Sequence, residues 1–170
     1  MKQISLLTIF AVFALIFSFT PVSAASIPDA KKQEGLRMLE ASGKIMTILG
    51  AQMDGDTALL EKTANEAVAI YDQILAENPV NVKALNARAT VKDTVTKGAG
   101  DPDFNKAIEI TSASVTTDDK NAEAFHDRAA AYRGLKKFDL ARTDYQKAIA
   151  LDPSKTHWVT ELKAMEIDAK

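Results

Sequence analysis

The segment from residue 122 to residue 155 constrains the fold more than any other stretch, because small and large apolar residues alternate there at helical spacing. Steps of three and four residues place each set on one face of a helix. Alanines let two antiparallel helices approach closely, while larger side chains fill the space around them. The two sets are Phe125, Ala129 and Tyr132, followed by Ala141, Tyr145 and Ala148. A break at residues 134–137 separates them, and Pro153 ends the second, so the segment predicts a helical hairpin.

This order of residues resembles the tetratricopeptide repeat (TPR) family, whose 34-residue helix–turn–helix unit ends in a proline. The chain departs from the family at Arg128, where the family usually has an aliphatic residue, so we expect one weakened packing contact there. A single hairpin cannot bury its apolar face. The resemblance therefore predicts neighbouring hairpins.

The pattern recurs upstream. Ala67, Tyr71 and Pro79 reproduce the spacing that ends the segment, and residues 80–89 align with residues 120–129. The alignment leaves a middle unit with about six extra residues relative to the standard length. Residues 97–102, which are rich in glycine and end in a proline, supply the extra length as a loop. We expect this loop to be an ordinary connector rather than a phosphate cradle, because no strand precedes it.

The first unit is harder to place. Its second helix should run over about residues 57–77, and its first over about residues 29–52, with both helices longer than usual. Leu39, Gly43 and Met46 are candidates for the large–small–large positions of the first helix.

We therefore predict an all-α fold in which antiparallel helix hairpins stack as a short right-handed α-solenoid. The repeat domain covers residues 25–155, with about three units at residues 29–81, 82–121 and 122–155. A capping helix follows at residues 156–170. Trp158, Leu162 and Met165 form its apolar stripe, and Glu161 is expected on its polar side, as a terminal cap requires.

Residues 1–24 have the order of a secretory signal peptide. Lys2 precedes an apolar run at residues 4–19, and small residues surround the expected cleavage site after Ala24. The run is short for a membrane span. We expect cleavage and no stable membrane insertion afterwards, with a retained anchor as the alternative. The protein would then be exported, either periplasmic or secreted, and the short apolar run and absence of cysteine favour a bacterium.

Composition excludes several kinds of function. With no cysteine, the chain has no disulfides, zinc–thiolate sites or thiol nucleophiles. The net charge of −2 and the absence of a long basic run argue against nucleic-acid binding. The only two histidines, His126 and His157, are too few for a metal site built on histidine. We predict no metal, no cofactor and no enzymatic activity. His126 follows the packed Phe125, so we expect it on the outer surface or in a groove.

The family resemblance also implies a function. In TPR proteins the first helix of each repeat lines a concave groove that binds peptides or folded partners. Asn86 and Arg133 could hold an extended polar segment, through its backbone and a carboxylate respectively. The known clamp for chaperone C-terminal carboxylates is not expected, because Ala87 and Asp127 follow the relevant positions. The groove candidates are Lys83, Asn86, Thr90, Asp93, Glu123, His126, Ala130 and Arg133.

The resulting prediction is a protein–protein interaction module or scaffold of the bacterial periplasm or cell envelope. Its partner would be another protein or an extended peptide. One alternative is a self-associating structural repeat protein. The other is a small-ligand protein or enzyme, which would need a deep pocket with convergent polar groups.

Overall fold

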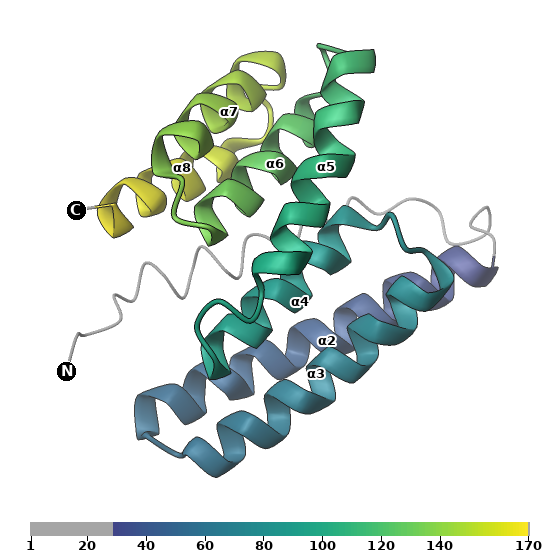
Figure 1. Ribbon diagram of the computed structural model, residues 1–170, viewed down its shortest axis with the longest axis vertical. Coiled ribbons are helices and arrows are strands. Elements are labelled where there is room, and N and C mark those ends of the chain that lie inside the picture. Colours follow the sequence, from purple (N-terminus) through teal and green to yellow (C-terminus); the bar gives the residue numbers. More distant parts are fainter. Residues whose placement is uncertain (1–28, 170) are drawn as a thin grey trace.

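The computed structural model describes residues 29–169, and in this range it contains seven α-helices and no strand. The predicted signal peptide at residues 1–24 lies outside the described residues. Figure 1 shows the helices as successive antiparallel pairs, with the two longest at one end. They are α2 (Asp29–Asp54), α3 (Thr57–Glu77), α4 (Val82–Val95), α5 (Asp101–Thr117), α6 (Ala122–Gly134), α7 (Phe138–Leu151) and α8 (Thr156–Asp168).

The helices pack in chain order. Each helix contacts the next, and α4 also contacts α6, so that the first helices of the second and third pairs lie side by side. Packing confined to near neighbours along the chain is the arrangement of a solenoid. The prediction of an all-α helical-repeat solenoid is confirmed. None of the helices within residues 29–169 is long and apolar enough to cross a bilayer.

Local sequence explains where the helices begin and end. Asp56, Asn81 and Asn121 precede α3, α4 and α6, and each side chain accepts a hydrogen bond from a backbone N–H three residues on, at 2.9–3.0 Å. Such caps satisfy donors that the first helical turn leaves free. Pro79 and Pro153 lie just past the ends of α3 and α7, where a proline cannot continue the helix.

The alanine pattern makes the core. Ala129, Ala141 and Ala148 are fully buried, and so is Tyr145 between them. Ala67 is likewise fully buried in α3. The close approach of helices through small residues, which the spacing predicts, is therefore present in both places.

Arg128 does not leave a weakened contact, contrary to the expectation from the family pattern. Its guanidinium donates to both carboxylate oxygens of the buried Asp144, with Nε–Oδ2 at 2.7 Å and Nη2–Oδ1 at 2.9 Å. Arg88 makes the same paired contact with Asp103 between α4 and α5, at 2.8 and 2.6 Å. A bidentate arginine–carboxylate pair gives geometric specificity as well as energy. In this chain it replaces the aliphatic contact in two hairpins.

The assignment of Leu39, Gly43 and Met46 to the packed face of α2 is wrong. The buried face of α2 consists of Ala41, Ser42, Ile45, Ile48 and Ala51, whereas Leu39 and Met46 are exposed. The helix carries two apolar stripes on opposite sides, and apolar spacing alone does not say which of them meets the core.

The extra residues of the middle hairpin are shared between a loop and a helix. The loop spans residues 96–100, and Pro102 lies in the first turn of α5 rather than in the loop. Gly98 adopts φ +84°, a conformation that favours glycine. At Gly100 the backbone approaches so closely that a Cβ atom would lie 2.3 Å from the carbonyl oxygen of Ala89. The loop is thus pressed against α4.

Candidate functional site: the groove along α4 and α6

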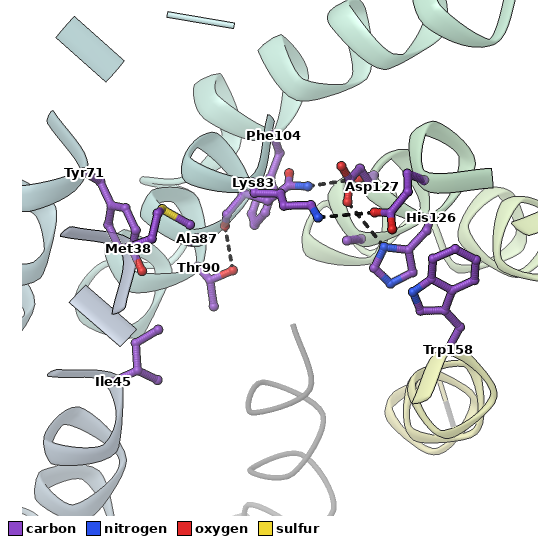
Figure 2. Close-up of a pocket in the computed structure, with 13 residues that line it drawn as sticks. Met38, Ile45, Tyr71, Lys83, Ala87, Thr90, Phe104, His126, Asp127 and Trp158 are labelled. Atoms are coloured by element: carbon purple, nitrogen blue, oxygen red, sulfur yellow. Dashed lines mark hydrogen bonds and ion pairs between the residues drawn. The ribbon is translucent and has the colours of Figure 1, made fainter. Parts of the chain in front are cut away.

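A groove runs across the first helices of the successive pairs (Figure 2). Residues of α2 and α3 form one wall, α4 and α6 form the floor, and Trp158 of α8 closes the other end. This is the surface that the family resemblance predicts. Its lining consists of Met38, Ile45, Tyr71, Lys83, Asn86, Ala87, Thr90, Phe104, Glu123, His126, Asp127, Ala130 and Trp158.

One wall of the groove is apolar. Figure 2 shows Met38, Ile45 and Tyr71 at the end of the groove away from His126 and Trp158. These residues were not among the predicted site residues. Met38 and Ile45 belong to α2, and the sequence does not determine which face of that helix is buried. The spacing of Tyr71 predicts a core residue rather than a site residue. The predicted polar partner surface therefore has an apolar side as well.

Asn86 holds the two floor helices together. Its Nδ2 donates to the backbone carbonyl of Asp127 at 2.9 Å, which ties α4 to α6. The residue is only 7% exposed, and its Oδ1 has no hydrogen-bond partner among the described residues. Thr90 lies one turn further along, and its hydroxyl donates to the carbonyl of Asn86 at 2.9 Å. The Nδ2 group of Asn86 is thus bonded inside the fold, whereas its Oδ1 is a buried acceptor without a partner among the described residues.

Charged groups at the α6 side of the groove are paired with one another. Glu123 lies between two lysines, with Lys83 Nζ at 3.2 Å and Lys155 Nζ at 3.3 Å. Burial raises the pKa of Glu123, but the lysines outweigh this effect and the net pKa is lowered. Burial lowers the pKa of Lys83, but Asp127 and Glu123 outweigh it and the net pKa is raised. Both groups are therefore charged at neutral pH.

Of the two places expected for His126, the structure has it in the groove lining rather than on the outer surface. It is 5% exposed and its ring stacks on Trp158, with ring centroids 4.8 Å apart. Its Nε2 lies 2.8 Å from Glu161 Oε2 and its Nδ1 lies 3.3 Å from Asp127 Oδ1. Burial lowers the pKa of His126, but hydrogen bonds to the two carboxylates outweigh it and raise the pKa to about 9. The imidazole is therefore a buried cation at neutral pH.

Glu161 is the buried partner of His126, and the prediction that it lies on the polar side of the cap is wrong. It is 0% exposed, on the face of α8 that packs against α6. A helical stripe of Trp158, Glu161 and Met165 thus faces inward, with one acid among apolar residues. A glutamate at such a position reads as solvent-exposed unless its partner is known, and the partner lies 35 residues away in the sequence.

Two of the predicted site residues do not line the groove. Asp93 Oδ1 accepts a hydrogen bond from the backbone N–H of Gly100 at 2.7 Å, which fixes the loop before α5. Arg133 pairs with Asp168, so it joins α6 to α8. The groove lining contains the other five residues of the predicted site, Lys83, Asn86, Thr90, Glu123 and His126, together with Ala130. Their role in binding a partner stays a prediction.

No group of three or more potential metal ligands converges anywhere in residues 29–169. Two acidic residues next to helix ends have local roles: Asp56 caps α3, and Asp118 accepts a hydrogen bond from the backbone N–H of Lys120.

The fold and the groove define a helical-repeat protein. Within it, the model of the tetratricopeptide repeat family matches residues 122–155, which span α6, α7 and the turn that follows. This segment is therefore similar to a tetratricopeptide repeat.

Several solved structures are similar to this chain. One is described as the first TPR of Spaghetti (RPAP3) bound to HSP90 peptide SRMEEVD; it is 21% identical, with a TM-score of 0.41, over 72% of this chain and 93% of that chain. The first TPR domain of the human RPAP3 protein is 21% identical, with a TM-score of 0.42, over 71% and 91%. A MamA RS-1 ArsTM double mutant is 20% identical, with a TM-score of 0.38, over 80% and 74%. Among curated proteins, none matches the chain.

Proposed function

We propose that this protein is a non-enzymatic binding module that holds an extended segment of a partner protein in the groove along α4 and α6. The observation that carries the proposal is the Oδ1 atom of Asn86. Asn86 lines the groove, and its Oδ1 atom is buried and has no hydrogen-bond partner among residues 29–169. A buried acceptor without a partner costs free energy, and a ligand that supplies a donor recovers it.

An extended peptide supplies such a donor. Every backbone N–H of a peptide other than at proline can donate, and a peptide in extended conformation presents these groups at regular intervals. Asn86 is held rigidly by its bond to Asp127, so little conformational entropy is lost when a peptide binds to it. We assign Asn86 Oδ1 the role of accepting one backbone N–H of the partner.

The rest of the lining defines the side chains that the partner should carry. Met38, Ile45 and Tyr71 offer an apolar wall, where an aliphatic or aromatic side chain of the partner can be buried. Lys83 lies at the floor, with its side chain 51% exposed, and can turn toward a carboxylate of the partner. We therefore expect a segment that combines an apolar residue with a nearby acidic one.

We further propose that the protein acts outside the cytoplasm, in the periplasm or as a secreted protein. The support is the order of residues 1–24, which is that of a cleaved signal peptide. Mass spectrometry of the protein recovered from a bacterial envelope fraction tests this directly. A mass that begins at Ala25 supports export and cleavage, and a mass that includes Met1 contradicts cleavage.

Peptide selection tests the binding function. A library of random peptides displayed on phage is selected on the immobilised protein, and the enriched peptides are measured against two variants. Ala87→Arg places a long charged side chain in the groove, whereas Ala113→Arg makes the same change at an exposed position of α5. We expect the peptides to lose at least tenfold in affinity with Ala87→Arg and to keep it with Ala113→Arg.

The outcome is interpretable only if both variants fold. Urea unfolding of each variant provides that check, and Lys83→Glu offers a second groove variant at an exposed position should Ala87→Arg be unstable. Equal affinity for the groove variants and the α5 control would refute the groove as the binding site. A library that yields no enriched peptide would refute peptide binding itself.

A further inference from the structure

The α2 helix carries a second apolar stripe that the fold does not use. Its large members are exposed: Leu36 by 52%, Leu39 by 55%, Met46 by 47% and Met53 by 67%. Together with two glycines they make up the outward stripe, whose members alternate in steps of three and four residues: Leu36, Leu39, Gly43, Met46, Gly50 and Met53. Such alternation produces a straight seam along one side of a helix, as in helices that pair along their length.

The outward stripe lies away from the other described helices. On a helix with 3.6 residues per turn, its residues are on the side opposite Ile45 and Ile48, which face the core. The main packing partner of α2 within the described residues is α3, on that core side. The stripe contains no charged residue from Leu36 to Met53. Within the part of the chain that the structure describes, no helix covers this apolar, uncharged strip on α2.

The two glycines of the stripe are not required by packing within residues 29–169. A Cβ atom added at Gly43 or Gly50 would meet nothing within 4 Å among these residues, so no described neighbour requires the small residue. Glycine within a helix is less favourable than alanine. Two such positions in one largely exposed stripe point to close approach by a group other than residues 29–169 of the same chain.

We propose that the outward stripe is an interface with a second copy of this chain, in which two α2 helices pack antiparallel about a two-fold axis. With the axis near the middle of the stripe, Leu36 lies opposite the partner's Met53, and Leu39 lies opposite the partner's Gly50. Met46 then lies opposite the partner's Gly43. Two of the three pairs set a large side chain against a glycine, so the stripe is complementary in size to its own reversed copy. A two-fold contact requires such self-complementarity.

Charge supports the same arrangement. The exposed Lys32 lies just before the N-terminal end of the stripe, and the exposed Asp54 lies just after its C-terminal end. Antiparallel pairing brings Lys32 near Asp54 of the second copy at both ends of the contact. Parallel pairing would instead set Lys32 against Lys32 and glycine against glycine, which leaves like charges together and gaps in the seam.

The size of the stripe indicates how strong this contact should be. From Leu36 to Met53 it is about 26 Å long at 1.5 Å per residue. A single helix pair of this length falls at or below the lower end of specific interfaces, about 1,200 Å² in total. We therefore expect a reversible dimer that dissociates on dilution.

Cysteine cross-linking tests both the contact and its direction, because the chain has no cysteine of its own. Leu39→Cys and Gly50→Cys variants of the protein are mixed and oxidised, and the products are separated on a non-reducing gel. Antiparallel pairing predicts a disulfide-linked dimer in the mixture and little in either variant alone. Two copies of residue 39 would be about 16 Å apart along the axis, too far for a disulfide.

A second variant tests the contact without risk to the fold. Gly43→Glu places a charge in the middle of the stripe at an exposed position with open space around it, and glutamate is the better helix former. We expect sedimentation equilibrium to show dimer affinity at least tenfold weaker than in the unmodified protein, with unfolding unchanged or shifted to higher urea. Ala113→Glu, on the exposed face of α5, is the control.

Three outcomes would overturn the proposal. The first is a monomer at every concentration tested. The second is Leu39→Cys cross-linking to itself as readily as to Gly50→Cys, which would mean parallel or non-specific contact. The third is a monomer whose stripe binds lipid vesicles in a manner that Gly43→Glu abolishes, which would assign the stripe to a membrane surface.

Discussion

The imidazole Nε2 of His126 lies 2.8 Å from Oε2 of Glu161, and this contact joins the third hairpin to the closing helix α8. Both side chains are buried, and the ring also stacks on Trp158 of the same helix. At the C-terminal end of the solenoid, α8 is therefore held to α6 by a buried ion pair and by ring stacking, in addition to apolar packing.

Removal of one member of this pair should be costly. Glu161→Ala leaves the His126 cation buried with one acidic partner fewer, and the expected loss in unfolding free energy is about 3–5 kcal/mol. Urea unfolding followed by circular dichroism measures it. Glu166→Ala, on the same helix and more exposed, is the matched control and should change stability by less than about 1 kcal/mol. Equal effects of the two substitutions would mean that the His126–Glu161 contact contributes little.

Stability should fall at alkaline pH. The pKa of His126 is about 9 in the folded protein, above the ordinary value of about 6.5, so the folded state binds the proton more tightly than the unfolded state does. Protonated His126 therefore stabilises the folded protein by roughly 3 kcal/mol. This stabilisation is fully present below pH 6.5 and is lost as the pH rises through 9. Unfolding curves from pH 6 to pH 10 measure the loss. His126→Gln should remove most of this pH dependence, and an unchanged slope in that variant would contradict the assignment.

The Arg128–Asp144 pair should behave as a unit. Arg128→Leu restores the aliphatic residue usual in the family but leaves the carboxylate of Asp144 buried without its bidentate partner, and we expect a loss of about 3 kcal/mol. The double variant Arg128→Leu/Asp144→Leu should recover most of this loss. A double variant as unstable as the single one would show that the pair is not what determines stability at this position.

The alanine contact between α6 and α7 should tolerate no extra volume. Ala129 is fully buried, so Ala129→Leu should lower the unfolding free energy by about 1–3 kcal/mol through overpacking. The same change at the exposed Ala113 should have little effect. If both variants unfold at the same urea concentration, the contact is looser than the structure indicates.

The sequence predicts the hairpins well because their packing depends on residues that repeat. Ala129, Ala141 and Tyr145 recur at helical spacing and are buried as that spacing requires. The face of α2 could not be chosen in the same way, because the exposed Leu39, Gly43 and Met46 follow one another in steps of four and three residues. The buried Ala41, Ile45 and Ile48 follow the same steps. When a helix at the end of an array carries two apolar stripes, either stripe could be its buried face, and residue spacing does not distinguish them.

The candidate site was predictable only in part, for a different reason. Lys83, Asn86 and Glu123 follow from the rotation of α4 and α6, and they line the groove. His126 and Glu161 could not be paired from the sequence, because a polar residue in a helix reads as exposed unless its distant partner is known. Long-range polar contacts between helices that are not neighbours in the chain leave no periodic signal.

The proposed peptide binding depends most directly on the buried acceptor of Asn86, and backbone N-methylation of a bound peptide tests this role. Each amide of a selected peptide is methylated in turn, and the affinity of every derivative is measured for the unmodified protein and for Asn86→Ala. We expect one position at which methylation weakens binding to the unmodified protein about tenfold, roughly 1.4 kcal/mol, because a single hydrogen bond to a buried acceptor is lost. The same methylation should have almost no effect on binding to Asn86→Ala, whereas an equal loss with both proteins at every position would contradict the assignment of Asn86.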